Sequence, residues 1–167
     1  MKYVVSILVH NQPGVLARIA GLFSRRGFNI DSLAVGTTDK PESSRMTVVL
    51  EGDDYIIEQV TKQLNKLVDV IKVSVLKSQE SVQRELVLFK VHITANTRSE
   101  VMQIVDIFRA KIVDVARNSM VIETTGDGSK IQAMEDLLRQ FGIKEMVRTG
   151  LIAVERGSKI IKSNKED

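Results

Sequence analysis

The amino-acid sequence predicts an α+β fold in which one unit, strand–helix–strand–strand–helix–strand, occurs twice in tandem. Three observations support this prediction. Apolar residues change between the period of a strand and the period of a helix in the same order in both halves. A fixed offset relates part of the second half to the first. The chain has 167 residues, of which 43% are apolar, so it is long enough for two small domains with their own cores.

Four strands and two helices are expected in the first half. The strands are predicted from alternating or continuous apolar residues at 3–9, 28–35, 46–50 and 70–76. The first helix follows the turn Asn11–Gly14 and stops at Gly27, which suits the position just past a helix end. Asp53 or Asp54 is expected to cap the second helix.

The same order of elements is expected in the second half. Strands are predicted at 86–93, 112–115 and 120–124, with a last one within 143–154. Thr97 and Glu100 have the spacing of a capping box, which predicts the start of the third helix. The fourth helix is expected to stop at Gly142.

The two halves share one register around their second helices. Adding 74 to a residue number carries Met46 to Met120, Gly52 to Gly126 and Asp53 to Asp127. The same addition carries the apolar face of the second helix, Ile57, Val60, Leu64 and Leu67, to Ile131, Met134, Leu138 and Phe141. A shared turn and a shared helix face indicate two copies of one plan.

This order of elements is the ferredoxin-like βαββαβ plan, a four-stranded antiparallel sheet with two helices on one face. The expected domains are 1–77 and 86–157, joined by a polar linker at 78–85 and followed by a charged C-terminal tail at 158–167. Because the helices cover only one face of each sheet, a neighbour should cover the other. We therefore expect dimerisation through the first domain.

Composition excludes several classes of function. The chain has no cysteine, hence no disulfide, thiolate nucleophile or cysteine-built zinc site. No apolar run approaches the roughly 20 residues of a membrane span, and the first residues lack the pattern of a secretory signal, which favours the cytoplasm. Aromatic residues make up 4% and the net charge is +3, so a nucleic-acid surface is not expected.

No catalytic or metal-ligating constellation is expected. His10 and His92 fall near the ends of equivalent strands, without the spacing of metal ligands. Gly126-Asp127-Gly128 resembles the start of a thiamine diphosphate motif, but no asparagine follows until Asn164. Because Asp127 aligns with Asp53, a helix cap explains it better.

The turn after the first strand is the candidate binding site. Asn11-Gln12-Pro13-Gly14-Val15-Leu16 leads from a buried strand to a helix N-terminus, whose free N–H groups suit a carboxylate. Gly14 lacks the Cβ that would hold a ligand away from the backbone, and Asn11 offers both a donor and an acceptor. A simple helix-starting turn explains the same residues equally well. The second half lacks the Pro-Gly pair.

Several longer motifs carry a resemblance to a known family. They are NQPGVLARI at 11–19, LFSRRGFNIDSL at 22–33, SRMT at 44–47 and QLNKLVDV at 63–70, with weaker ones at 84–86, 108–115 and Gly126. Residues 3–76 resemble an ACT domain, an amino-acid-sensing module. Nearly the whole chain resembles the small regulatory subunits of acetohydroxyacid synthase, also called acetolactate synthase.

The resemblance implies a regulatory subunit without catalytic residues, metal or cofactor of its own. Its partner, the catalytic large subunit, is expected to carry thiamine diphosphate, Mg²⁺ and FAD. The small subunit is expected to activate that partner and to confer feedback inhibition by a branched-chain amino acid, usually valine. Paired ACT domains are expected to form one eight-stranded sheet. The implied effector site joins Asn11, Gly14, Val15 and Leu16 of one chain to Asn29 and Ile30 of the other.

Two other functions stay open. One is an amino-acid-binding ACT module that serves a different partner, although no added domain supports it. The other is a small enzyme of the acylphosphatase kind. That enzyme needs an arginine in the phosphate-binding turn, and here the first arginine is Arg18.

Overall fold

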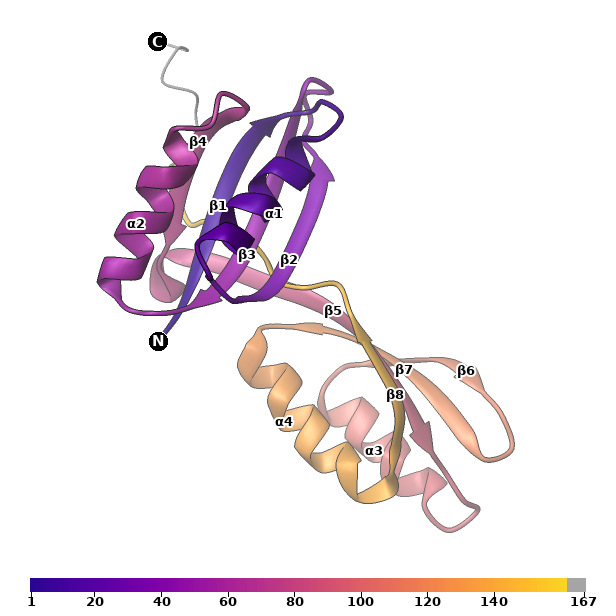
Figure 1. Cartoon of the computed structure of the whole chain (residues 1–167). Coiled ribbons are helices and arrows are strands. Elements are labelled where there is room, and N and C mark those ends of the chain that lie inside the picture. The colour runs from indigo at the N-terminus through magenta and orange to yellow at the C-terminus, as the bar shows by residue number, and fades with distance from the viewer. Residues whose placement is uncertain (162–167) are drawn as a thin grey trace. The chain divides into compact units, whose positions relative to one another are not determined.

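The computed structural model describes residues 1–161 and divides the chain into two compact units. The first unit comprises Met1–Gln83 together with the described residues from Leu151 onward, and the second comprises Arg84–Gly150. Each unit contains the predicted order of strands and helices, so the prediction of two ferredoxin-like α+β units is confirmed (Figure 1).

The first unit is a four-stranded antiparallel sheet in the order β2-β3-β1-β4. Its strands are β1 (Lys2–His10), β2 (Ile30–Thr37), β3 (Ser43–Glu51) and β4 (Val70–Leu76). Helices α1 (Val15–Arg25) and α2 (Asp54–Asn65) cover one face of this sheet (Figure 1). Between them lies a core that includes Val5, Ile7, Ile19, Phe23 and Val60.

The second unit repeats the plan with its sheet in the order β6-β7-β5-β8. After the short turn η1 (Ser78–Glu80), its elements are β5 (Ser81–His92), α3 (Arg98–Ile107), β6 (Lys111–Val115), β7 (Ser119–Gly126), α4 (Gly128–Leu138), η2 (Arg139–Phe141) and β8 (Ile143–Arg148). A last strand, β9 (Ile152–Glu155), pairs with β5. Phe89, Ile122 and Met134 are at the centre of the second core.

Equivalent aspartates cap α2 and α4, as the shared register predicts. The side chain of Asp53 accepts a hydrogen bond from the Ile56 amide at 2.8 Å, and that of Asp127 accepts one from the Lys130 amide at 2.9 Å. The second pair of residues is the first displaced by 74 positions. Asp127 is therefore a helix cap, which explains its place beside two glycines without a cofactor motif.

Gly27 ends α1 as predicted, in the left-handed conformation at φ 68°. The Gly27 amide donates to the Ser24 carbonyl, and the Phe28 amide donates to the Phe23 carbonyl. These two bonds form a Schellman motif, and the rings of Phe23 and Phe28 meet edge to face with centroids 6.3 Å apart. The motif fixes the direction in which the chain leaves α1 toward Asn29 and β2.

The capping box expected at Thr97 and Glu100 is wrong. The hydroxyl of Thr97 accepts a hydrogen bond from the Thr94 amide at 2.8 Å and makes no cap bond to α3. The Thr94 hydroxyl in turn accepts one from the Thr97 amide. The two threonines thus close a turn on each other, which removes Thr97 from the capping role.

The polar residues 78–85, predicted as a linker, form η1 and the start of β5. β5 begins at Ser81, and two of its buried polar side chains form hydrogen bonds. The hydroxyl of buried Ser81 donates to the Lys77 carbonyl at 2.7 Å, and buried Glu85 accepts two hydrogen bonds from Arg148. The carboxylate of Glu85 raises the pKa of the Arg148 guanidinium above its ordinary range.

The second compact unit ends at Gly150, whereas the second domain was predicted to extend to residue 157. The single strand expected within 143–154 is two strands, because Gly150 turns the chain at φ 85° between β8 and β9. Leu151 and Ala153 pack on the helix-free face of the first sheet, where they contact Val4, Val49 and Leu76. Part of the helix-free face, which we expected a second molecule to cover, is therefore covered by the chain itself. Of the tail predicted at 158–167, residues 162–167 lie outside the part of the chain that the structure describes.

Candidate functional site

The turn between β1 and α1 is built on a glycine in the left-handed conformation. Gly14 has φ 84° and is the N-cap residue of α1, where it supplies no side-chain cap. Few residues other than glycine adopt this conformation without strain, so the sequence is specific here. The N-cap residue therefore provides no side-chain acceptor for the amides of the first turn of α1.

The backbone donors at the start of α1 are only partly used. The Val15 amide makes a long 3.4 Å hydrogen bond to the Gln12 carbonyl, and the Arg18 amide donates to the Gly14 carbonyl. Within residues 1–161, the amides of Leu16 and Ala17 have no backbone acceptor. Two uncapped amides at the positive end of a helix are suited to a carboxylate.

Arg18 brings a cation to the same place. The Cβ of any residue replacing Gly14 would lie 2.9 Å from Nη1 of Arg18, so the guanidinium lies directly beside the glycine. Nε of Arg18 donates to Oδ2 of Asp69 at 2.6 Å, and the Asp69 carbonyl accepts from the His10 amide at 2.9 Å. Asp69 thus holds both the end of β1 and the arginine.

Arg18 and Asp69 are the functional candidates that sequence reasoning missed. Both lie in motifs that carried the family resemblance, but neither was given a role. The signal for Arg18 was its position four residues after Gly14, which places it one turn along the helix on the same side. Asp69 had no local signal, because its partner is 51 positions away in the sequence.

Asn11 is held by the loop between β2 and β3. Its backbone amide donates to the Glu42 carbonyl at 2.8 Å, and Nδ2 donates to the Pro41 carbonyl at 3.0 Å. These bonds fix the turn against the loop and leave Oδ1 and one Nδ2 proton of the exposed amide for a ligand.

Val15 and Leu16 differ in what they offer. The side chain of Val15 is 4% exposed and belongs to the core, so only its backbone faces the turn. Leu16 is 46% exposed and presents an aliphatic side chain beside the free amides. Leu16 is therefore the residue of this pair that an apolar ligand group could contact.

Asn29 and Ile30 lie at the other end of the same sheet. Ile30 pairs with Leu50, which also pairs with Tyr3 near the start of β1, whereas the turn follows His10 at its end (Figure 1). At about 3.3 Å per strand residue, this separates them from the turn by roughly 25 Å. One chain therefore brings together Asn11, Gly14, Val15 and Leu16, but not Asn29 and Ile30.

Nothing in the described part of the chain forms a metal centre or a membrane span. Residues 1–161 contain no group of three or more histidine, aspartate or glutamate side chains placed to hold a metal ion. Within the same residues, no helix is long and apolar enough to cross a membrane.

Comparison with protein families matches both units. Residues 5–72 match the family described as the AHAS small subunit-like ACT domain. Residues 84–157 match the family described as the small subunit of acetolactate synthase. The boundary between the two matches falls close to the division into compact units at Gln83 and Arg84.

Comparison with individual proteins covers nearly the full chain. A probable acetolactate synthase small subunit of Archaeoglobus fulgidus is 57% identical over 159 residues, which are 95% of this chain and 99% of that protein. An acetolactate synthase small subunit of Mycobacterium leprae is 50% identical and covers 93% of this chain and 92% of its own length.

A solved structure agrees with this similarity. The crystal structure of an acetolactate synthase small subunit from Thermotoga maritima matches with a TM-score of 0.87 and 44% identity, over 95% of this chain and 99% of that one. Identity at this level across both units, together with the shared fold, leads to one conclusion: this chain belongs to the family of acetolactate synthase small subunits.

Proposed function

We propose that this small subunit activates the catalytic large subunit of acetolactate synthase and makes it sensitive to feedback inhibition by valine or another branched-chain amino acid. The observation that supports this most is the uncapped first turn of α1. There, Gly14, two amides without backbone acceptors and the Arg18 guanidinium lie close together at the surface.

The effector carboxylate would lie on this helix N-terminus. Its negative charge is attracted by the free amides and by Arg18, and hydrogen bonds between ionised groups are stronger than those between neutral ones. Gly14 allows close approach of the ligand to the backbone. The exposed side chain of Leu16 offers an aliphatic contact that suits a branched side chain.

The other half of the effector site would come from a second copy of this chain. Asn29 and Ile30 lie near the start of β2, which is an edge strand of the first sheet. An edge strand has unpaired N–H and C=O groups along its outer side and readily pairs with another strand. Antiparallel pairing of two β2 edges would carry the Asn29 of one chain toward the turn of the other.

The chemistry would belong to the large subunit. Thiamine diphosphate, Mg²⁺ and FAD are proposed to be bound there and not by this chain. The role of the small subunit is then to favour one state of its partner, and the effector acts by preferring a different state.

Reconstitution of the complex from purified subunits tests this function. The chain alone should form no acetolactate from pyruvate, even with thiamine diphosphate, FAD and Mg²⁺ added. Mixed with its large subunit, it should raise the rate, and valine should then lower the rate only in the mixture. Turnover by the isolated chain, or a mixture with neither a higher rate nor a response to valine, leucine or isoleucine, would contradict the proposal.

A further inference from the structure

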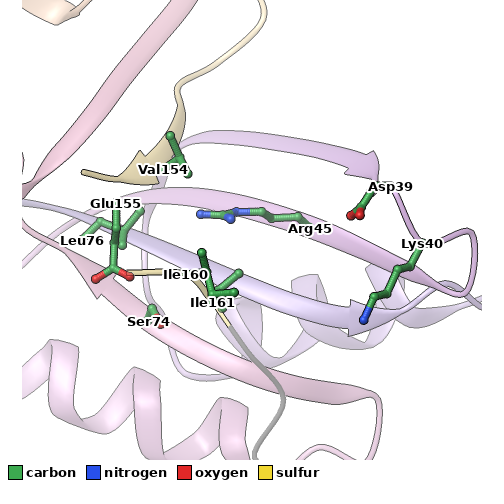
Figure 2. Close-up of a pocket in the computed structure, with 9 residues that line it drawn as sticks. All are labelled: Asp39, Lys40, Arg45, Ser74, Leu76, Val154, Glu155, Ile160 and Ile161. Atoms are coloured by element: carbon green, nitrogen blue, oxygen red, sulfur yellow. The ribbon is translucent and has the colours of Figure 1, made fainter. Parts of the chain in front are cut away.

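A cavity lies on the opposite face of the first sheet from α1 and α2. It has a volume of about 330 Å³ and lies between the sheet and the segment that follows Gly150. Figure 2 shows that Arg45 crosses its centre, with Ser74 and Leu76 from β4 on one side, Glu155 from β9 and Ile160 and Ile161 near it. All of these residues belong to the first unit. The cavity is within the usual size range for a small-molecule site.

Arg45 comes from the SRMT motif that carried the family resemblance, and the effector turn does not use it. It pairs with Leu8 of β1 and Gly36 of β2 in the middle of the sheet. Its neighbour Met46 belongs to the core under the helices, and successive side chains of a strand point to opposite faces, so the Arg45 guanidinium projects from the helix-free face.

The charge of Arg45 is poorly compensated. Its Nη2 donates to the Ala153 carbonyl at 2.8 Å, while Nε is buried without a hydrogen-bond partner. No carboxylate lies in ion-pair contact with it in the part of the chain that the structure describes. Burial lowers the pKa of the guanidinium, whereas the nearby charge of Glu155 acts in the opposite direction. A half-buried cation without an anion in contact is a favourable position for a ligand carboxylate.

The remaining lining complements the rest of an amino acid. Glu155 places a negative charge in the cavity without contacting Arg45, so the two opposite charges leave space between them. Leu76, Ile160 and Ile161 provide an aliphatic wall. Asp39 and Lys40, from the loop between β2 and β3, also line the cavity. The Arg45 cation, the separate Glu155 carboxylate and the apolar surface match a carboxylate, an ammonium group and an aliphatic side chain in turn.

We propose that this cavity is a second ligand site that binds a small aliphatic α-amino acid, with the carboxylate on Arg45 and the ammonium group on Glu155. The site is formed by one chain alone, whereas the effector site proposed above needs residues of two chains. It is also independent of that function, because it uses none of the same residues.

Calorimetric titration of the full-length chain with valine tests the second site. In the Gly14→Asp background, which should disable the effector turn, about one valine per chain should still bind. Arg45→Met should weaken that binding by roughly tenfold to a hundredfold, the effect expected for one charge-assisted hydrogen bond. Arg156→Gln removes an exposed charge of the same segment outside the cavity lining and should leave binding unchanged.

Two ligand analogues test the proposed roles separately. 3-Methyl-2-oxobutanoate keeps the carboxylate of valine and lacks the ammonium group. Isobutylamine keeps the ammonium group and lacks the carboxylate. Both should therefore bind at least about tenfold more weakly than valine. Glu155→Gln should weaken valine and not the oxoacid. If the oxoacid binds as tightly as valine, the ammonium assignment to Glu155 is wrong.

A third variant covers the case in which Arg45→Met fails to fold because Arg45 also holds Ala153. Ser74→Leu fills the cavity without touching that contact and should abolish the binding that remains in the Gly14→Asp background. The proposal is overturned if Gly14→Asp alone eliminates all valine binding, or if folded Ser74→Leu binds valine as before. If the proposed effector site at the turn were wrong, a different result would follow: Gly14→Asp would leave valine inhibition of the reconstituted complex unchanged.

Discussion

Nε of Arg18 on α1 donates to Oδ2 of Asp69, just before β4, at 2.6 Å. The two side chains are unequally exposed, with 51% of the Arg18 side chain and 12% of the Asp69 side chain accessible to solvent. Because of this difference in exposure, removing the charge of Arg18 and removing the charge of Asp69 have different effects on stability. Removing the arginine leaves a largely buried carboxylate without its cation, whereas neutralising the aspartate leaves a cation that water can solvate.

Arg18→Met should therefore destabilise the chain more than Asp69→Asn. We expect the free energy of unfolding to fall by about 2–3 kcal/mol for Arg18→Met and by about 1 kcal/mol for Asp69→Asn, because asparagine still accepts a hydrogen bond. Urea denaturation of each variant and of the double variant gives the values. Equal losses for the two single variants would contradict the structural asymmetry.

Asp127 should make stability depend on pH in a defined direction. Hydrogen bonds from the Lys130 amide and the Ser129 hydroxyl lower its pKa below the ordinary 3.8. A carboxylate with a depressed pKa in the folded state contributes stability above its unfolded pKa and loses it as pH falls through the folded pKa. Asp127→Ser keeps a capping oxygen that does not titrate. The stability advantage of aspartate over serine should shrink as the pH is lowered from about 7 to about 3. An advantage that stays constant or grows would contradict this.

Ala153 should be the critical position of the strand that returns to the first unit. It is 8% exposed against Val4, Val49 and Leu76, so Ala153→Asp would bury a charge among apolar side chains. We expect a loss of about 2–4 kcal/mol in the free energy of unfolding. Ile152→Asp is the matched control, because Ile152 is the neighbouring residue and is 58% exposed. If both substitutions cost the same, the segment does not pack as described.

Pairing through β2 should make the full-length chain a dimer, which sedimentation velocity can measure. Adjacent amides of a strand point to opposite edges, so Ala34→Pro and Val35→Pro remove one outward and one inward donor. One variant should dissociate the dimer while keeping its stability, and the other should lose stability by breaking the pairing of β2 with β3. A wild-type chain that is monomeric at micromolar concentration would remove the basis for a shared effector site.

Features set by neighbouring residues could be predicted from the sequence. Asp127, and Asp53 or Asp54, were predicted as caps because a cap depends on a few residues around it, and the same is true of the Gly27 stop. The exception, Thr97, also has a local cause, since Thr94 competes for the same hydroxyl. The βαββαβ order followed from apolar periods, which arise along one strand or helix.

Features set by distant residues could not be predicted. The apolar residues at 152–154 are typical of a strand, but an apolar run carries no information about which sheet that strand joins. The ion pair of Arg18 with Asp69 and the hydrogen bond of Arg45 with Ala153 join residues 51 and 108 positions apart. The candidate turn was found because glycine with φ 84° leaves a sequence signature, while the charges around it depend on the packing of the whole unit.

The most direct test of the proposed regulation is valine inhibition of the reconstituted complex that contains Gly14→Asp. Aspartate is among the residues that tolerate left-handed conformations, and its side chain would meet only the flexible end of Arg18, so the fold should survive. Gly157→Asp is the control, because Gly157 has a comparable φ of 72° with open space around it. We expect Gly14→Asp to raise the inhibitory valine concentration roughly a hundredfold through like-charge repulsion, with the uninhibited rate and the control unchanged. If the Gly14→Asp complex is folded, active and inhibited at the wild-type valine concentration, the turn after β1 is not the effector site.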